Sequence, residues 1–293
     1  MGKFKTSWAL AKSSWAVLRQ DKQLAVFPVL TFLGSVVVAG LFLGLVLVTR
    51  TTDAAGNKAL GPIGYVLIAL AYLGLAFVQT YFLAALVAGA NERLNGGDPT
   101  IGSALAAANR RLHVILAWSV ILATVGLILQ VIRERLGFVG VLIAGALGAA
   151  WEILTFLTVP IIVMEGVGPI NALKRSGTLF KSTWGENLVG QAGLGLVGLV
   201  ASLPGILVIV LGALTGVTAV IIGAVAIGGV YLCVAAAIVN ALSGIYRTAL
   251  YRFATVGEAP AGFDQEIMVS AFRPKKGSSG GNPHFGLGSG SNN

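Results

Sequence analysis

Six long apolar runs constrain this chain more than any other feature of its sequence. The runs cover residues 24–48, 62–90, 112–132, 136–164, 187–212 and 217–249. A helix needs about 20 mostly apolar residues to cross the ~30 Å hydrocarbon core of a bilayer, and each run meets that length. The runs lack the alternation that is typical of barrel strands. We therefore predict an all-α, polytopic transmembrane bundle of six spanning helices.

The composition excludes an ordinary soluble domain. Hydrophobic residues make up 56% of the 293 residues and charged residues 11%, whereas soluble domains carry roughly 25% charged residues. The segment before the first run is rich in Lys, Arg and Trp and does not resemble a cleavable signal peptide, so we expect the first span to be retained. The single cysteine, Cys233, lies inside the sixth run and cannot form an intramolecular disulfide.

The basic residues predict the orientation of the spans. If the six runs alternate across the bilayer, 16 of the 20 Lys and Arg fall on the side that carries both termini. The other four are Arg50, Lys58, Arg133 and Arg135. Because loops rich in Lys and Arg stay in the cytoplasm, we predict a multi-pass protein with cytoplasmic N- and C-termini. We expect anionic headgroups on that face as partners, and no nucleic acid, since the charges lie in short loops without a nucleic-acid-binding module.

Residues 3–19 have the spacing of an amphipathic helix. Apolar residues recur at intervals of three and four on one face, namely Phe4, Trp8, Ala11, Trp15 and Leu18. Basic residues recur every seven positions on another face, namely Lys5, Lys12 and Arg19. A basic helix with tryptophans on its apolar side is typical of the headgroup layer. We therefore expect Trp8, Trp15 and the three basic residues to lie at the cytoplasmic membrane surface.

The same pattern recurs before the third and fifth runs. Asp98 as N-cap and Pro99 predict the start of a second surface helix. A third begins at Pro169 and presents an apolar face formed by Ile170, Leu173, Phe180 and Trp184. Its opposite face carries Lys174, Arg175 and Lys181. We expect Trp184 and these three basic residues to lie at the same membrane surface.

Each surface segment precedes two runs joined by a short loop. We therefore predict that residues 1–256 form a membrane domain of three units, near 1–95, 96–167 and 168–256. In each unit a cytoplasmic-face amphipathic helix is followed by a hairpin of two spans. Residues 257–276 are expected to form a polar cytoplasmic tail with Phe263 among its docking points, and the Gly- and Ser-rich residues 277–293 a disordered tail.

Glu152 is the one ionisable residue between Arg135 and Glu165. Small residues precede it at four-residue intervals, namely Gly140, Ala144 and Gly148, which indicates close packing on another helix. A charge at a helix centre costs ~2.5–3.5 kcal/mol on insertion scales. Glu152 is therefore either a protonated contact between helices or a group that lines a proton, ion or substrate path. The candidate partners at comparable depth are Gln79, Asn240 and Tyr231.

Other features of the runs concern helix packing and helix breaks. A comparable stripe in the sixth run comprises Ala224, Gly228, Ala236, Asn240 and Gly244. Two prolines predict interruptions of the fourth and fifth spans, namely Pro160 and Pro204. The stretch GLGLVG at 193–198 matches a dinucleotide-binding fingerprint in letters, but it lies within a span with no preceding strand. Close packing accounts for its glycines better.

The sequence carries no constellation of reactive groups. Its two histidines, His113 and His284, lie in unrelated segments, and it has no zinc-protease motif and no Cys–His pairing. We therefore expect no enzymatic activity, no cofactor and no metal site.

Several stretches resemble a known family. They are FKTSWALAKSSWAVLRQDKQLAVFP, NERLNGGDPTIGSAL, VPIIVMEGVGPINALKRSGTLFKSTWGENLVG and GFDQEIMVSAFRPK, and the resemblance extends over essentially residues 4–276. They resemble a bacterial family of uncharacterised six-span membrane proteins, known as a domain of unknown function. The third stretch is also loosely similar to the membrane domains of some glycerophosphodiester phosphodiesterases, whose catalytic barrel this sequence lacks. The resemblance implies six spans and a bacterial plasma-membrane location, and it supplies no catalytic or binding residues.

Two functions follow as expectations. The first is a non-enzymatic integral membrane protein that organises or scaffolds the bacterial plasma membrane, as a homo-oligomer or with a membrane-protein partner. The alternative is a channel or secondary transporter for a small solute or ion that uses Glu152, with Gln79 and Asn240 as further lining residues.

Overall fold

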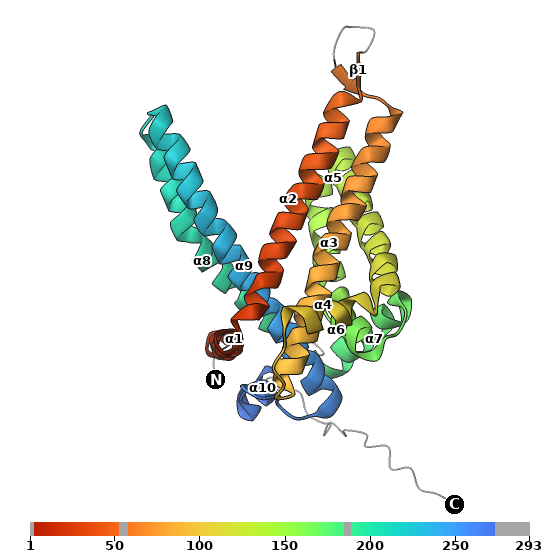
Figure 1. The fold of residues 1–293 in the computed structure, drawn as a ribbon, viewed down its shortest axis with the longest axis vertical. Coiled ribbons are helices and arrows are strands. Elements are labelled where there is room, and N and C mark those ends of the chain that lie inside the picture. The colour runs from red at the N-terminus through yellow and green to blue at the C-terminus, as the bar shows by residue number, and fades with distance from the viewer. Residues whose placement is uncertain (1–2, 53–57, 185–188, 273–293) are drawn as a thin grey trace, which may run out of the picture.

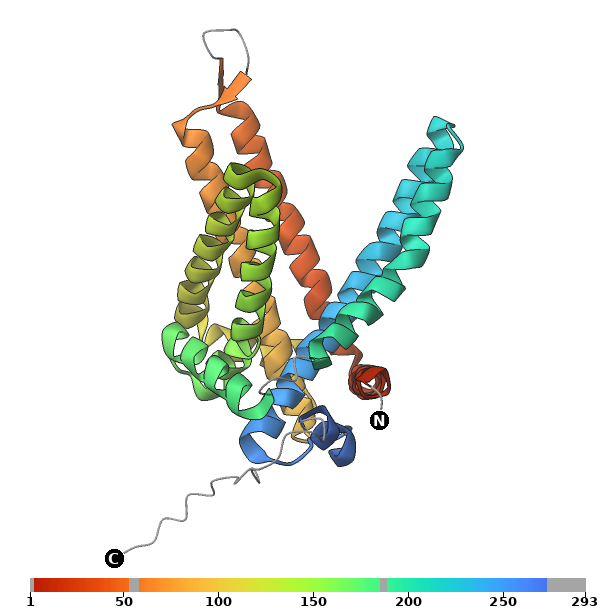
Figure 2. The same cartoon turned by 180° about the vertical axis from the view of Figure 1, so that it is seen from behind.

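The computed structural model describes residues 3–52, 58–184 and 189–272. Within these residues the chain is almost entirely helical, apart from one antiparallel strand pair, β1 (Arg50–Thr52) and β2 (Lys58–Leu60). The described helices form three antiparallel hairpins that converge at one end (Figures 1 and 2). We call this end the base, and the opposite ends of the hairpins the tips. The predicted all-α fold is confirmed.

The first hairpin pairs α2 (Val26–Val48) with α3 (Pro62–Leu94), and the two strands join them at the tip. Helix α1 (Lys3–Gln20) and the short η1 (Lys22–Ala25) precede it at the base. Asp21 begins η1, since its carboxylate accepts a 3.1 Å hydrogen bond from the Gln23 amide. Glycine allows α2 and α3 to pack closely. A Cβ at Gly74 would lie only 2.9 Å from the Val38 side chain.

The second hairpin follows α4 (Ile101–Asn109). Helix α4 begins with a capping box, in which the Thr100 hydroxyl accepts from the Ser103 amide and the Ser103 hydroxyl accepts from the Thr100 amide, both at 3.0 Å. The prediction of Asp98 as the N-cap is therefore wrong by two residues. A serine three positions after Thr100 makes the reciprocal pair possible, whereas Asp98 forms a 3.6 Å ion pair with Arg93.

Helix α5 (Leu112–Thr155) turns back on itself at Gly137. This residue has φ 53° and ψ −133°, a conformation that glycine adopts without a Cβ clash. The rings of Trp118 and Trp151 consequently stack with centroids 6.1 Å apart, although a straight helix would separate them by about 50 Å. The first arm of α5 corresponds to the predicted run 112–132, and the second arm forms the first part of the run 136–164. Figure 2 shows the reversal at the tip.

A short break separates α5 from α6 (Thr158–Glu165), two residues before Pro160. Ser176 satisfies both backbone groups at this break: its hydroxyl donates to the Leu154 carbonyl at 2.6 Å and accepts from the Leu157 amide at 3.2 Å. The predicted interruption at Pro160 is therefore present. Pro204, in contrast, lies inside α8, which continues through it.

The third hairpin pairs α8 (Val189–Leu214) with α9 (Thr218–Val256) and follows α7 (Pro169–Trp184). Three glycines of α8, seven residues apart, bring the two helices together. Gly198 faces Val239, Gly205 faces Leu232, and Gly212 faces Ala224. The packing explanation for Gly198 thus agrees with its surroundings. Above the base this hairpin diverges from the other two (Figures 1 and 2).

The buried core lies at the base, while the arms expose apolar side chains. Leu24, Ile115, Ile161 and Ile245 are almost completely buried there, whereas residues along the arms such as Phe138 remain exposed. Four helical segments of the described residues are long and apolar enough to cross a membrane, namely Lys22–Val48, Pro62–Leu94, Leu112–Glu165 and Thr218–Val256. Length and composition therefore suit a membrane location.

Helix α1 buries a face that only partly matches the predicted one, since Ala11 and Leu18 of the predicted apolar face are buried as expected. Leu10, Ser14 and Val17 are buried, because α1 lies against α8, α9 and α10 (Gln265–Phe272). Trp15, predicted on the apolar face, is 42% exposed, and Lys12 and Arg19 are exposed as expected. The side chains of Lys5 and Trp8 lie outside the described set.

The other predicted surface residues divide in the same way. Lys174, Arg175 and Lys181 of α7 are exposed, whereas Ala172 and Ser176 are buried against the core. The side chain of Trp184 lies outside the described set. In the predicted tail, Phe263 and Met268 are buried at the base, so part of this tail docks. Residues 277–293 lie outside the described residues.

Candidate functional site: a groove between the first and third hairpins

A cavity of about 630 Å³ lies where the first and third hairpins diverge. Helices α2, α3 and α9 line it, and the lining of α9 extends from Leu232 to Arg247. At 1.5 Å per residue this stretch is about 22 Å long. Gln79 and Asn240 line the cavity and are both exposed, so the cavity is open on one side. We call it the lateral groove. Its volume lies within the ~300–1,000 Å³ range of small-molecule sites.

Several polar side chains interrupt the otherwise apolar lining of the groove. Gln79 comes from α3, and Asn240 and Ser243 come from α9. Thr31 and Ser35 of α2 complete the polar lining, together with Cys233 and Arg247. The structure thus brings together two predicted site residues, Gln79 and Asn240, from different hairpins.

Arg247 occupies the basal end of the groove. Its guanidinium carbon lies 4.5 Å from the centroid of the Phe156 ring, a cation–π arrangement. Its Nε atom is buried and donates to no acceptor of the described residues. The ion pairs among the described residues are Arg93–Asp98 and Arg175–Glu165, so Arg247 takes part in neither. A buried donor without an acceptor costs about 1–3 kcal/mol, more for a charged group.

Glu152 does not line the groove. Its side chain is exposed on α5, one helical turn before the break at Phe156. The expected contacts with Gln79, Asn240 or Tyr231 are not found among the described hydrogen bonds. Glu152 also takes part in neither of the ion pairs among the described residues. The physical reason is that α5 packs on its other arm through Gly148, which lies beside Leu129, and through Trp151, which stacks on Trp118. The neighbouring Glu152 is exposed.

Tyr231 lies on the far side of α9 from the groove's polar residues. It is 42% exposed, and its ring contacts the position of Gly205 on α8. A smaller hollow of about 190 Å³ is formed there by Tyr231 and mostly aliphatic residues of α8 and α9. The structure therefore separates Tyr231 from Gln79 and Asn240.

Sequence reasoning missed Arg247 as a site residue. It was counted among the basic residues of the cytoplasmic side, at the end of the sixth run. The signal lay in the helical spacing: Ala236, Asn240, Gly244 and Arg247 follow at intervals of four, four and three, which places them on one face of α9. The stripe of small residues therefore ends in a cation.

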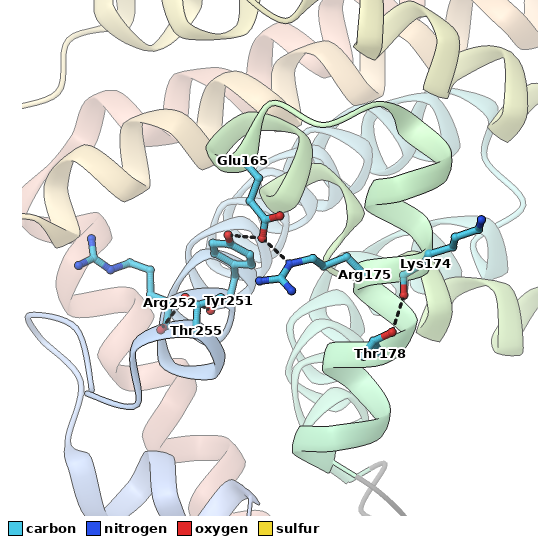
Figure 3. Close-up of polar contacts among 7 residues, drawn as sticks. All are labelled: Glu165, Lys174, Arg175, Thr178, Tyr251, Arg252 and Thr255. Carbon is cyan, nitrogen blue, oxygen red and sulfur yellow. Dashed lines mark hydrogen bonds and ion pairs between the residues drawn. The ribbon is translucent and has the colours of Figure 1, made fainter. Parts of the chain in front are cut away.

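A second polar cluster holds the three hairpins together at the base (Figure 3). Glu165, at the end of α6, accepts two 2.8 Å hydrogen bonds, from the Tyr251 hydroxyl and from Arg175 Nε. Arg252 donates to Asn91 and Asn95 at the end of α3. We call Glu165, Arg175 and Tyr251, with Arg252 and its asparagine partners, the basal clasp.

Arg175 keeps its positive charge in the clasp. The hydrogen bond to Glu165 raises the pKa of Arg175 above its usual value, against the opposing effect of burial. Arg175 therefore stays charged throughout the physiological pH range. The stability that its ion pair contributes is lost only as the pH rises through that raised pKa. Among the described residues no group of three His, Cys, Asp or Glu side chains could hold a metal ion. The clasp's hydrogen bonds connect α6 to α7 and α9, and α9 to α3.

Comparison with known proteins gives one match. A family model described as a family of unknown function (DUF6159) matches residues 62–263. This region begins at α3 and ends after α9, so it includes most of the groove and all of the basal clasp's residues. No curated protein and no solved structure matched the chain.

Proposed function

The chain belongs to the DUF6159 family of unknown function, and from that premise we propose that it is a non-enzymatic integral membrane protein that organises or scaffolds the bacterial plasma membrane. It has six spans in three hairpins and cytoplasmic termini, and it works as a homo-oligomer or with a membrane-protein partner.

The distribution of burial carries the proposal. In a soluble protein the longest apolar helices form the core. Here only 6% of the residues in the most apolar stretch of each of α2, α3 and α9 are buried. Their side chains therefore face whatever surrounds the arms, and large exposed apolar surfaces of this kind mark membrane or protein contacts. The reversal of α5 at Gly137 supports two spans rather than one in the second hairpin.

The charges support the proposed orientation. Arg50 lies at the tip of the first hairpin, and Arg133 lies near the tip of the second. Lys174, Arg175 and Lys181 lie at the base with α7. The richer basic end is therefore the base, and the positive-inside rule assigns it to the cytoplasm.

The divergent third hairpin supports a scaffold over a closed conduit. The outer face of α8 exposes Leu203, Leu207 and Leu214 at 52%, 57% and 77%. Above α1, this helix packs on α9. An apolar face of this length offers a surface for another helix, and tight seams of small residues already hold α8 and α9 as one rigid unit.

Cysteine accessibility tests the topology. On a Cys233→Ser background, single cysteines at Arg50, Arg133 and Thr215 are expected to react with a membrane-impermeant maleimide from outside intact cells. Cysteines at Lys174 and Glu258 are expected to react only after permeabilisation. Labelling of Arg133→Cys and Lys174→Cys from the same side would contradict six spans.

The scaffold itself is tested by mass photometry in nanodiscs. A monomer at every concentration, with no co-purified membrane partner, would contradict the scaffold.

A transporter is the second candidate, favoured by the meeting of Gln79 and Asn240 in the groove. It predicts solute flux in liposomes that Glu152→Gln or Asn240→Ala abolishes. The exposed position of Glu152 outside the groove is the reason that the scaffold takes precedence.

A further inference from the structure

We propose that the lateral groove binds one anionic glycerophospholipid, with the lipid phosphate at Arg247 and an acyl chain along α2 and α9. This inference rests on the proposed membrane location and names a ligand for the site. It adds a specific binding event to the general attraction between basic loops and anionic headgroups.

The first observation that supports a lipid phosphate is the buried Nε of Arg247, which has no acceptor among the described residues. The guanidinium lines the groove at its basal end, has one face on Phe156, and leaves its buried Nε without an acceptor. Neither of the ion pairs among the described residues includes Arg247, so no described carboxylate neutralises it within 4 Å. A phosphate is the complementary group, because guanidinium donors match phosphate oxygens in planar, paired geometry.

Neighbouring hydroxyl and amide groups extend the polar end. Ser243 precedes Arg247 by one helical turn, and Asn240 precedes Arg247 by two turns, both lining the groove. The Thr31 hydroxyl, across the groove, already donates to the Phe27 carbonyl at 2.9 Å. Ser243 and Asn240 therefore lie on the same helical face as Arg247, where the ester groups of a lipid with its phosphate at Arg247 would follow.

The remainder of the groove suits an acyl chain. Phe32, Phe82, Leu83 and Leu232 line it, and the side chain of Phe32 is 48% exposed towards the surroundings. The lining of α9 is about 22 Å long, which is long enough for an extended chain within one leaflet of a ~30 Å hydrocarbon core. The groove is open sideways, so a lipid reaches Arg247 without leaving the bilayer.

The same features argue against a soluble phosphate as the natural occupant. A free anion gains the contact with Arg247 but leaves the apolar length of the groove unfilled. A lipid gains both. The acyl chain covers the apolar lining that a soluble anion would leave open.

Native mass spectrometry of the full-length protein, released from detergent with added lipid, tests the proposal. The probes are phosphatidylglycerol, phosphatidylcholine and soluble glycerol phosphate. Wild-type protein is expected to retain one phosphatidylglycerol at activation energies that remove phosphatidylcholine. Arg247→Gln is expected to weaken that binding by about ten- to a hundredfold, which corresponds to a lost charged hydrogen bond.

Two further variants locate the acyl chain. Ala236→Phe fills the groove, since Ala236 lines it, and is expected to reduce phosphatidylglycerol retention at least tenfold. Ala226→Phe makes the same change at an exposed position of α9 outside the groove and is expected to behave as wild type. Arg247→Lys keeps the charge and is expected to retain part of the selectivity, which covers the case in which Arg247→Gln does not fold.

Three results would overturn the proposal. They are equal retention in wild type and Arg247→Gln, loss with Ala236→Phe but no headgroup preference, and displacement of the lipid by soluble glycerol phosphate at comparable concentration. Failure of the scaffold would appear separately, in the cysteine topology or in the oligomeric state. A correct topology with no lipid selectivity therefore rejects this inference alone.

Discussion

The Tyr251 hydroxyl donates a 2.8 Å hydrogen bond to Glu165, and this contact joins the end of the second hairpin to the end of the third. The two residues are 86 positions apart in the chain. Glu165 also binds Arg175 at the start of the third unit, so one carboxylate connects three helices.

Tyr251→Phe is expected to lower the free energy of unfolding by about 1.5 kcal/mol, because the hydrogen bond goes to a charged acceptor. The measurement is an SDS titration in detergent, followed by tryptophan fluorescence. Tyr65→Phe is the matched control, since Tyr65 is 64% exposed on α3. Equal stability of the two variants would show that the clasp contributes nothing measurable.

Ser176→Ala is expected to cost about 1–3 kcal/mol, since it leaves the Leu157 amide and the Leu154 carbonyl without their partner at the α5–α6 break. Hydrogen exchange at the Leu157 amide should accelerate in the same variant. Thr178→Ala, on the exposed side of α7, removes a hydroxyl that bonds within its own helix and serves as the control. A slow Leu157 amide in Ser176→Ala would contradict the role of Ser176.

Gly212→Ala is expected to destabilise the third hairpin by about 1–3 kcal/mol, because the new Cβ would meet the Ala224 methyl across the seam. Gly223→Ala makes the same change in the same hairpin, at a position with nothing within 4 Å. It should be neutral or stabilising by up to about 1 kcal/mol, since alanine favours the helix. Thermal unfolding in detergent separates the two, and the reverse order would rule out the seam.

Gly166→Ala is expected to cost about 1–2 kcal/mol or more. Gly166 ends α6 with φ 68°, and the Arg111 guanidinium lies where a Cβ would be. Gly168→Ala, two residues on, has open space around it and no positive φ, so its stability should stay near wild type. The melting temperatures of the two variants provide the comparison.

The sequence predicted the helices and their pairing better than it predicted their contacts. The gap between runs 112–132 and 136–164 places the reversal of α5 near Gly137, because a polar, charged loop and a glycine coincide there. Pro160 predicts the break before α6 because proline suits the first turn of a helix. These two local signals agree with the structure, whereas Pro204 does not interrupt α8 and the N-cap of α4 is Thr100 instead of Asp98.

The contacts between hairpins depend on distant residues, and there the prediction was incomplete. Trp15 of α1 is exposed, although Ala11 and Leu18 of the same predicted face are buried. The position of α8, α9 and α10 decides which side of α1 is covered. For Glu152, helical spacing indicated a packed stripe, but the partner arm of α5 ends the close approach at Gly148. Arg247 was overlooked because a basic residue near the end of a run is also what the positive-inside rule expects.

The packing of α1 against α8, α9 and α10 sets an order of assembly. Helix α1 is made before α8, α9 and α10, and these three later helices provide its docking surfaces. The basal core therefore cannot close during synthesis, whereas each hairpin can insert and pair as soon as its second arm emerges. Closure of the base becomes the final step of maturation, so a chain truncated before α8 would hold its first two hairpins in the bilayer with α1 still undocked beneath them.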